Sequence, residues 1–229
     1  MNNFQIFWDQ FVSGGYNNFL LGLKNTALIA VFGLVIGFLI GCILATVKII
    51  PKENVIVTIC KRICDIYIML FRGTPMVVQL LLMHFALFPM IGLNIDSVIE
   101  AVIIFGMNSA AYMAEILRSG INAVDSGQME AGRSLGFGFT ATMMRIVLPQ
   151  AIKNILPTLG NEFIALIKET SVVSFIAVMD LTRSFQAIAN STYEYFVPYI
   201  MLALVYLVLV MLITLLIRLL ERRLAKSER

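Results

Sequence analysis

The sequence predicts an all-α integral membrane protein with five transmembrane helices, its N-terminus outside and its C-terminus inside. Of the 229 residues, 59% are hydrophobic and 14% are charged, whereas a typical soluble domain has about 25% charged residues. The mean hydropathy is +0.89. Charged residues gather between apolar runs of roughly 20 residues, the helix length that crosses a hydrocarbon core. Helices are expected because lipid offers no partner to backbone polar groups.

Five apolar segments are the expected spans: 22–47, 63–88, 97–117, 154–178 and 195–218. Around them we expect an N-terminal interfacial segment over 1–21, a transmembrane domain over 22–218 and a cytoplasmic tail over 219–229. Aromatic residues of the N-terminal segment recur at helical spacing, at Phe4, Phe7, Trp8 and Phe11. Such an apolar helix face lies in the membrane interface or packs as an arm on the protein, and the pattern leaves both alternatives open.

The first span carries a stripe of small residues at four-residue spacing, formed by Gly33, Gly37, Gly41 and Ala45. Residues four apart lie on one face of a helix. Because small side chains do not hold two backbones apart, the stripe predicts close packing against another helix.

The second span is interrupted at Arg72-Gly73-Thr74-Pro75. Pro75 lacks an N–H and disfavours helical geometry in the residue before it. One interpretation is a broken helix whose second half turns its N-terminal N–H groups toward a carboxylate-bearing solute. The other is a proline kink with Arg72 near the cytoplasmic interface.

Basic residues set the predicted orientation, because they are enriched in cytoplasmic segments. The segments placed inside hold Lys48, Lys52, Lys61, Arg62, Arg118, Arg133, Arg145 and Lys153, and the tail adds Arg218, Arg222, Arg223, Lys226 and Arg229. The opposite side holds Lys24 and Arg183.

The inside loop over 118–153 is too short to fold as an enzyme domain with its own core. We expect a short helix from Ser126 to Leu135, a turn at Gly136-Phe137-Gly138-Phe139, and a second helix from Thr140 to Val147 that ends at Leu148-Pro149. A helix–turn–helix at the membrane face suits the docking of a cytosolic partner.

The loop also carries a motif: Glu130-Ala131-Gly132, three residues, Gly136, nine residues, then Ile146-Val147-Leu148-Pro149. This resembles the EAA loop of ABC importer permeases, with Gly132 in place of the second alanine. Four further stretches look like the polar amino acid permease subgroup of that family: Phe71-Arg72-Gly73-Thr74-Pro75, Ala114-Glu115-Ile116-Leu117-Arg118, Pro149-Gln150-Ala151 and Lys168-Glu169-Thr170-Ser171.

The resemblance implies a type I ABC importer permease fold and a set of partners. These are a cytosolic ABC ATPase dimer that binds ATP and Mg, a second permease copy or paralogue, an extracytoplasmic solute-binding protein, and an amino acid as substrate, with membrane lipid around the spans and no nucleic acid. The chain has no Walker A sequence, so no ATP site of that kind is expected in it. The implied location is the cytoplasmic (inner) membrane of a prokaryote. The implied ATPase-coupling residues are Glu130, Ala131, Gly132, Gly136, Leu148 and Pro149.

Polar residues within the spans are the candidates for substrate binding, because such residues are costly in lipid and line pathways or pair with one another. The set is Arg72, Thr74, Gln79, Asn108, Tyr112, Glu115, Asn161 and Glu162. Glu162 lies roughly 12 Å into the fourth span at about 1.5 Å per residue, close to the midplane. It lines a solute cavity with Asn161, or it bonds a neighbouring helix, for example through an ion pair with Arg72.

For other candidates, a structural role is an alternative to substrate binding. Glu115 and Arg118 are three residues apart, which favours an ion pair on one helix surface over ligand contact. Asn108 and Tyr112 bind solute or bridge helices. The single histidine, His84, has no partner nearby in the sequence and is given no function.

No pattern of catalytic or metal-ligating residues is present, which argues against a membrane-embedded enzyme. The remaining alternative is an ATP-independent channel or secondary carrier for small solutes. A channel has no need for the inside loop, and secondary carriers usually show internal symmetry that this sequence lacks.

Overall fold

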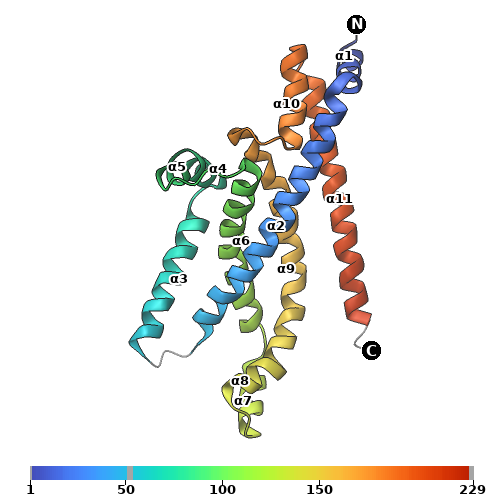
Figure 1. The fold of residues 1–229 in the computed structure, drawn as a ribbon. Helices are drawn as coiled ribbons and strands as arrows, with labels where there is room; N and C mark the ends of the chain where they lie inside the picture. The colour runs from blue at the N-terminus through green and yellow to red at the C-terminus, as the bar shows by residue number, and fades with distance from the viewer. Residues whose placement is uncertain (1, 51–53, 227–229) are drawn as a thin grey trace.

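The computed structural model describes residues 2–50 and 54–226, and all regular secondary structure within them is helical. Lys52 and Arg229, which the predicted orientation uses, lie outside the described residues, as do the side chains of Arg223 and Lys226. The long helices are α2 (Tyr16–Ile49), α3 (Val55–Gly73), α6 (Ser97–Asn122), α9 (Leu148–Glu169) and α11 (Phe196–Lys226). Figure 1 shows them side by side along one direction.

Helices α2 and α6 form the centre of the bundle, packed along the small-residue stripe. The glycines lie directly on the α6 backbone and side chains: a Cβ at Gly37 would lie 2.6 Å from the Ser109 Cβ, and one at Gly41 would lie 2.5 Å from the Met113 Cβ. Real Cβ atoms do not come so close, so both positions need glycine for this packing. The predicted close approach is confirmed.

The second apolar segment is a broken helix. Helix α3 ends at Gly73, Thr74 is extended with φ −122° and ψ 146°, and α4 (Met76–Leu82) begins after Pro75. A π-helical turn (Met83–Leu87) and the short α5 (Phe88–Met90) continue α4. The two halves meet at an angle of 106°, so Figure 1 shows α4 and α5 lying across the direction of α3.

By length and composition, three helices of the described residues can cross a membrane: the combined segment Asn3–Ile49, Ser97–Asn122 and Phe196–Arg222. The bent pair Val55–Gly73 and Met76–Met90 makes up to four. Helix α9 is outside this set, and it carries Lys153, Glu162, Lys168 and Glu169. It packs against α6, α2 and α11.

The end of the bundle that carries the N-terminus holds a helix that the sequence analysis missed (Figure 1). After α9, a 3₁₀ helix (Thr170–Ile176) leads to α10 (Leu181–Thr192). The Asp180 carboxylate caps α10 by accepting from the N–H groups of Thr182 at 3.0 Å and Arg183 at 2.9 Å. The buried face of α10 is formed by Leu181, Phe185, Ile188 and Ala189.

The N-terminal aromatic face packs partly against α10. Helix α1 (Asn3–Gln10) joins α2 through a π-helical turn (Phe11–Gly15). Phe7 is buried, with its ring stacked 6.3 Å from that of Phe185, whereas Phe4 and Trp8 are exposed. One side of α1 is therefore bound to the protein and the other is free.

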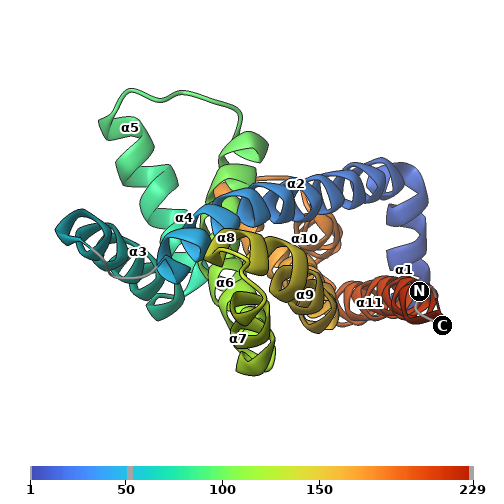
Figure 2. The same cartoon turned by 90° about the horizontal axis from the view of Figure 1, so that it is seen from below.

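The two termini lie at opposite ends of the bundle (Figure 1). The end with α1 and α10 carries the N-terminus. The opposite end carries the last residues of α11 and the loop of α7 (Ser126–Ser134) and α8 (Phe139–Thr142). Figure 2, seen from below, places α7 and α8 beneath α6 and α9.

Candidate functional site

The loop at the C-terminal end of the bundle has the predicted helix–turn–helix form. The Asp125 carboxylate caps α7 by accepting from the Gly127 N–H at 2.7 Å. The turn after α7 places Gly136 at φ +87°, a left-handed conformation that other residues rarely adopt. The Phe137 N–H then donates to the Gly132 carbonyl at 3.2 Å, which closes the turn.

Gly132 is the contact point between the two halves of the loop. It is buried, and a Cβ there would lie 2.5 Å from the Thr142 Cγ2 and 3.0 Å from the Ile146 Cδ1. Thr142 is fully buried, and its hydroxyl donates to the Gly138 carbonyl at 3.1 Å. The residue that departs from the EAA pattern therefore allows α7 to seat on a threonine.

The loop exposes an apolar tip. Leu135 is 77% exposed and Phe137 is 43% exposed, and Glu130 and Ala131 are exposed on α7. The prediction that the second loop helix ends at Leu148-Pro149 is wrong. Helix α8 runs through a π-helical turn (Met143–Val147) directly into α9, and Pro149 is the second residue of α9, immediately after that turn. The loop is thus continuous with α9.

Three candidate substrate residues instead fasten the helix break. The Gln79 Nε2 donates to the carbonyl oxygens of Phe71 at 2.8 Å and Thr74 at 2.9 Å, and it lies 2.8 Å from the Thr74 hydroxyl. The Asn108 Nδ2 donates to the Gln79 Oε1 at 2.9 Å. These bonds satisfy the carbonyls that the end of α3 leaves free, so Asn108 bridges α6 to the break.

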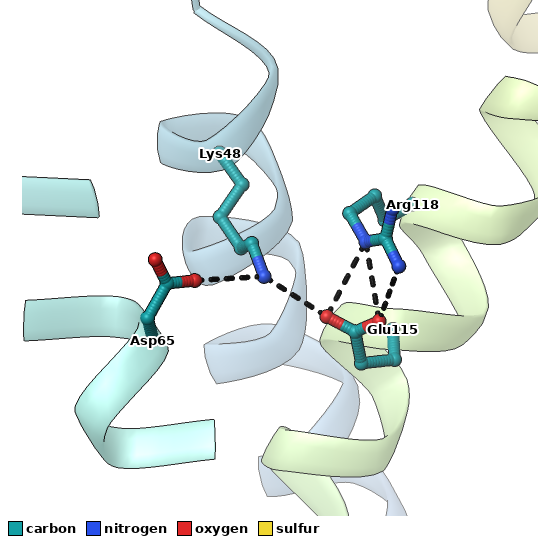
Figure 3. Close-up of polar contacts among 4 residues, drawn as sticks. All are labelled: Lys48, Asp65, Glu115 and Arg118. Atoms are coloured by element: carbon teal, nitrogen blue, oxygen red, sulfur yellow. Dashed lines mark hydrogen bonds and ion pairs between the residues drawn. The ribbon is translucent and has the colours of Figure 1, made fainter. Parts of the chain in front are cut away.

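Glu115 lies in an ion-pair network that ties three helices together (Figure 3). The predicted pair with Arg118 is confirmed, at 2.6 Å. The Lys48 ammonium on α2 lies 3.0 Å from Glu115 on α6 and 3.0 Å from Asp65 on α3. The sequence analysis missed the Lys48 bonds, because that residue is 67 positions from Glu115.

A cavity of about 410 Å³ lies beside this network, between the end of α3, the second half of α6 and the first half of α9. Of the candidate residues it is lined by Arg72, Tyr112 and Glu115. The sequence analysis did not single out Ser119, Asn154 or Thr158, which complete its polar wall. Their signal was weak, because isolated Ser, Thr and Asn residues at span ends are common.

Glu162, four residues after Thr158 on α9, does not line this cavity and is half-buried. Its Oε1 accepts a hydrogen bond from the Ser109 hydroxyl on α6 at 3.3 Å. Among the described residues it has no ion-pair partner, and Arg72 lies instead over the Tyr112 ring, 5.4 Å from its centroid. Asn161 is exposed and does not line the cavity.

His84 has a partner that the sequence did not reveal. Its Nδ1 pairs with the carboxylate of Glu100, a buried residue at the start of α6. The pair joins the π-helical turn after α4 to α6, and the 16-residue separation explains why sequence proximity gave no sign of it.

The fold and the loop together define a membrane-embedded component of a transport system. The chain belongs to the family of inner membrane components of binding-protein-dependent transport systems, whose model matches residues 37–226. This membership confirms the expectation of a transport subunit rather than an enzyme.

Individual relatives cover nearly the whole chain. It is 40% identical over 209 residues to the arginine transport system permease protein ArtQ of Bacillus subtilis, covering 91% of this chain and 93% of the relative. The solved structure of an amino acid ABC transporter with histidines is 42% identical with a TM-score of 0.83, covering 91% of this chain and 94% of that one. A chain of the inward-facing MetNI methionine ABC transporter is 19% identical with a TM-score of 0.67, covering 93% and 95%, which shows the fold alone.

Proposed function

We propose that this chain carries polar amino acids inward across the cytoplasmic membrane of a prokaryote, driven by ATP that separate ATPase subunits bind with Mg. The single observation that carries the proposal is the family match over 37–226. The amino acid class is supported by two relatives of 40% and 42% identity, which are named for arginine transport and for amino acid transport. A second permease copy or paralogue and an external solute-binding protein complete the proposed assembly.

The proposed topology has five spans, with α9 as the fifth beside the three continuous helices and the bent pair. Its Glu162 faces α6, where the carboxylate accepts a hydrogen bond from Ser109. The N-terminus lies outside with α1 at the membrane interface, and the tail over 219–229 lies inside.

The α7–α8 loop is the proposed contact with the ATPase, through Glu130, Ala131, Gly132, Gly136, Leu148 and Pro149. The exposed apolar tip supports this role, because an isolated water-facing loop gains nothing from Leu135 and Phe137. Its continuity with α9 connects the loop to Glu162 through one unbroken helical segment.

A photo-crosslinker in place of Leu135 tests the loop contact. In the purified assembly it should label the ATPase and not the binding protein. The control replaces Tyr193, which is 85% exposed after α10 at the opposite end of the bundle, and it should never label the ATPase. Labelling of the ATPase from Tyr193 but not from Leu135 would show that the proposed orientation is wrong.

We further propose that Glu162 contacts the substrate and favours an amino acid that carries a positive or strongly donating side chain. The support is a half-buried carboxylate with one hydroxyl donor and no cation among the described residues. Glu162→Gln should change the order of uptake among labelled arginine, histidine, glutamine and cystine. Uptake rates and preference equal to those of the native protein would refute this role.

A further inference from the structure

Helix α11 stands at the edge of the bundle with most of its surface uncovered. Figures 1 and 2 show it beside α9, on the side of the molecule away from α3. Of its most apolar 18-residue stretch, 6% is buried within the chain. In a membrane such a surface contacts lipid or another protein. Two grooves run along it, and the charged residues at their ends distinguish between these occupants.

The first groove, of about 240 Å³, lies where α9 and α11 meet beside α2. The two helices touch at Gly160, where a Cβ would lie 2.6 Å from the Ile217 Cγ2. Leu159 and Phe163 form part of its apolar wall. Among the described residues that line the groove, Glu221 alone is ionisable, and it is half-buried. The groove is therefore an apolar slot with a carboxylate at the C-terminal end of α11.

The second groove, of about 520 Å³, follows the surface of α11 itself. Its lining is apolar at Val208, Met211 and Leu215, and Arg218 is the last residue that lines it. Residues three apart lie on one helix face, so Arg218 and Glu221 bring the ends of the two grooves together. Two apolar grooves that meet beside ionisable groups match a lipid with two acyl chains and a polar headgroup.

The place where the grooves meet carries both signs of charge. Arg222 follows Glu221 directly and lies four residues after Arg218, and both arginines are exposed. None of the three side chains belongs to an ion pair among the described residues. Guanidinium groups donate parallel hydrogen bonds to a phosphate, and a carboxylate accepts from an ammonium group. The patch therefore suits a ligand that brings a phosphate and an ammonium group together.

A second copy of this chain fits the same patch poorly. Copies that share a membrane are related by an axis along the bundle, so equivalent residues lie at equal depth. Packing of α11 on α11 would bring Arg218 and Arg222 close to the same two cations of the second copy. Like charges that face each other oppose association, so charge complementarity favours the lipid.

We propose that the groove between α9 and α11 binds a phospholipid with an ethanolamine headgroup. One acyl chain lies in this groove and the other along α11, the phosphate accepts from Arg218 and Arg222, and the ammonium group donates to Glu221. A choline headgroup has no N–H to donate, and a glycerol headgroup has no cation, so Glu221 favours ethanolamine over both. The site goes beyond the transport function and does not depend on which solute is carried.

The test is native mass spectrometry of the purified assembly, titrated with phosphatidylethanolamine, phosphatidylcholine and phosphatidylglycerol of identical acyl chains. The ethanolamine lipid should bind about 5- to 10-fold more tightly than the other two, because it alone completes a charge-assisted hydrogen bond to Glu221. Glu221→Gln should bring the ethanolamine-to-choline ratio close to 1. Arg222→Gln should weaken all three lipids, since each carries the phosphate. Glycerophosphoethanolamine, which lacks the acyl chains, should not compete.

Asp9→Asn is the control, because Asp9 is an exposed carboxylate at the opposite end of the bundle, and it should keep the native preference. Leu220→Trp places a larger side chain in the first groove and should reduce the binding of all three lipids at an unchanged Tm. Equal binding of the three lipids to the native assembly, or a preference that survives Glu221→Gln, would overturn the proposal. So would competition by glycerophosphoethanolamine, or a Leu220→Trp variant that loses a permease copy from the assembly and still binds lipid.

Discussion

Gly132→Ala tests the α7–α8 loop most sharply, because helix propensity favours alanine at this position whereas the packing against Thr142 favours glycine. An alanine at 132 would restore the E-A-A pattern and improve local helix propensity by about 1 kcal/mol. Its Cβ would nevertheless lie 2.5 Å from the Thr142 Cγ2. Thr142 is fully buried, and turning it away breaks its hydrogen bond to the Gly138 carbonyl.

The expected magnitude follows from these opposing effects. Overpacking costs about 1–3 kcal/mol, and the loss of one hydrogen bond costs about 1 kcal/mol. After the gain of about 1 kcal/mol in helix propensity, docking of α7 on α8 should weaken by about 1–3 kcal/mol, which lowers the docking equilibrium constant by up to roughly 100-fold. The coupling of transport to ATP hydrolysis should fall with the docked population.

The assay is the ratio of solute transported to ATP hydrolysed in proteoliposomes, which should fall for Gly132→Ala. Thr142→Ser removes the clashing methyl and keeps the hydroxyl, so the double variant should recover the native ratio. A native ratio for Gly132→Ala alone, or a double variant no better than the single one, would refute the reasoning.

Three further predictions concern the bundle. Gly37→Ala places a Cβ 2.6 Å from the Ser109 Cβ, so it should destabilise the fold by about 1–3 kcal/mol. Its Tm should be lower than that of the control Gly14→Ala, whose Cβ meets nothing within 4 Å. Equal Tm values would contradict the packing of α2 on α6. Lys48→Met removes two charge-assisted bonds and should lower Tm more than Asp65→Asn does. The Asp65 side chain is 51% exposed, and exposed ion pairs contribute about 0–1 kcal/mol. A larger loss of Tm for Asp65→Asn would contradict the network. His84→Leu leaves the buried Glu100 without its partner and should lower the free energy of unfolding by about 1–3 kcal/mol. The double variant with Glu100→Leu should regain part of that stability. A single variant as stable as the native protein would argue against the pair.

Features encoded locally were predictable from the sequence. The small-residue stripe, the break before Pro75, the loop turn at Gly136 and the Glu115–Arg118 pair each depend on residues within a few positions of one another. Periodicity and turn chemistry act over that range. Helix α10 could also have been predicted from nearby residues, since Asp180 and the buried face from Leu181 to Ala189 have the pattern of a capped amphipathic helix. It was missed because a search for apolar spans passes over a helix with so many polar residues.

Features that join distant helices were not predictable. Lys48 meets Glu115 only because the stripe brings α2 onto α6. Gln79 was a candidate for substrate, and only the 106° bend reveals that it caps the end of α3. The cavity is likewise a property of three helices, so Asn154 and Thr158 carried no signal by themselves.

The central claim is that this chain moves amino acids only when a partner hydrolyses ATP. The most direct measurement is uptake of labelled arginine, histidine, glutamine and cystine into proteoliposomes that hold the chain with its ATPase, with the binding protein outside. We predict accumulation of at least one amino acid when ATP and Mg are enclosed, and none when ATP is omitted. Flux of equal rate without ATP would contradict the account and indicate a channel or secondary carrier.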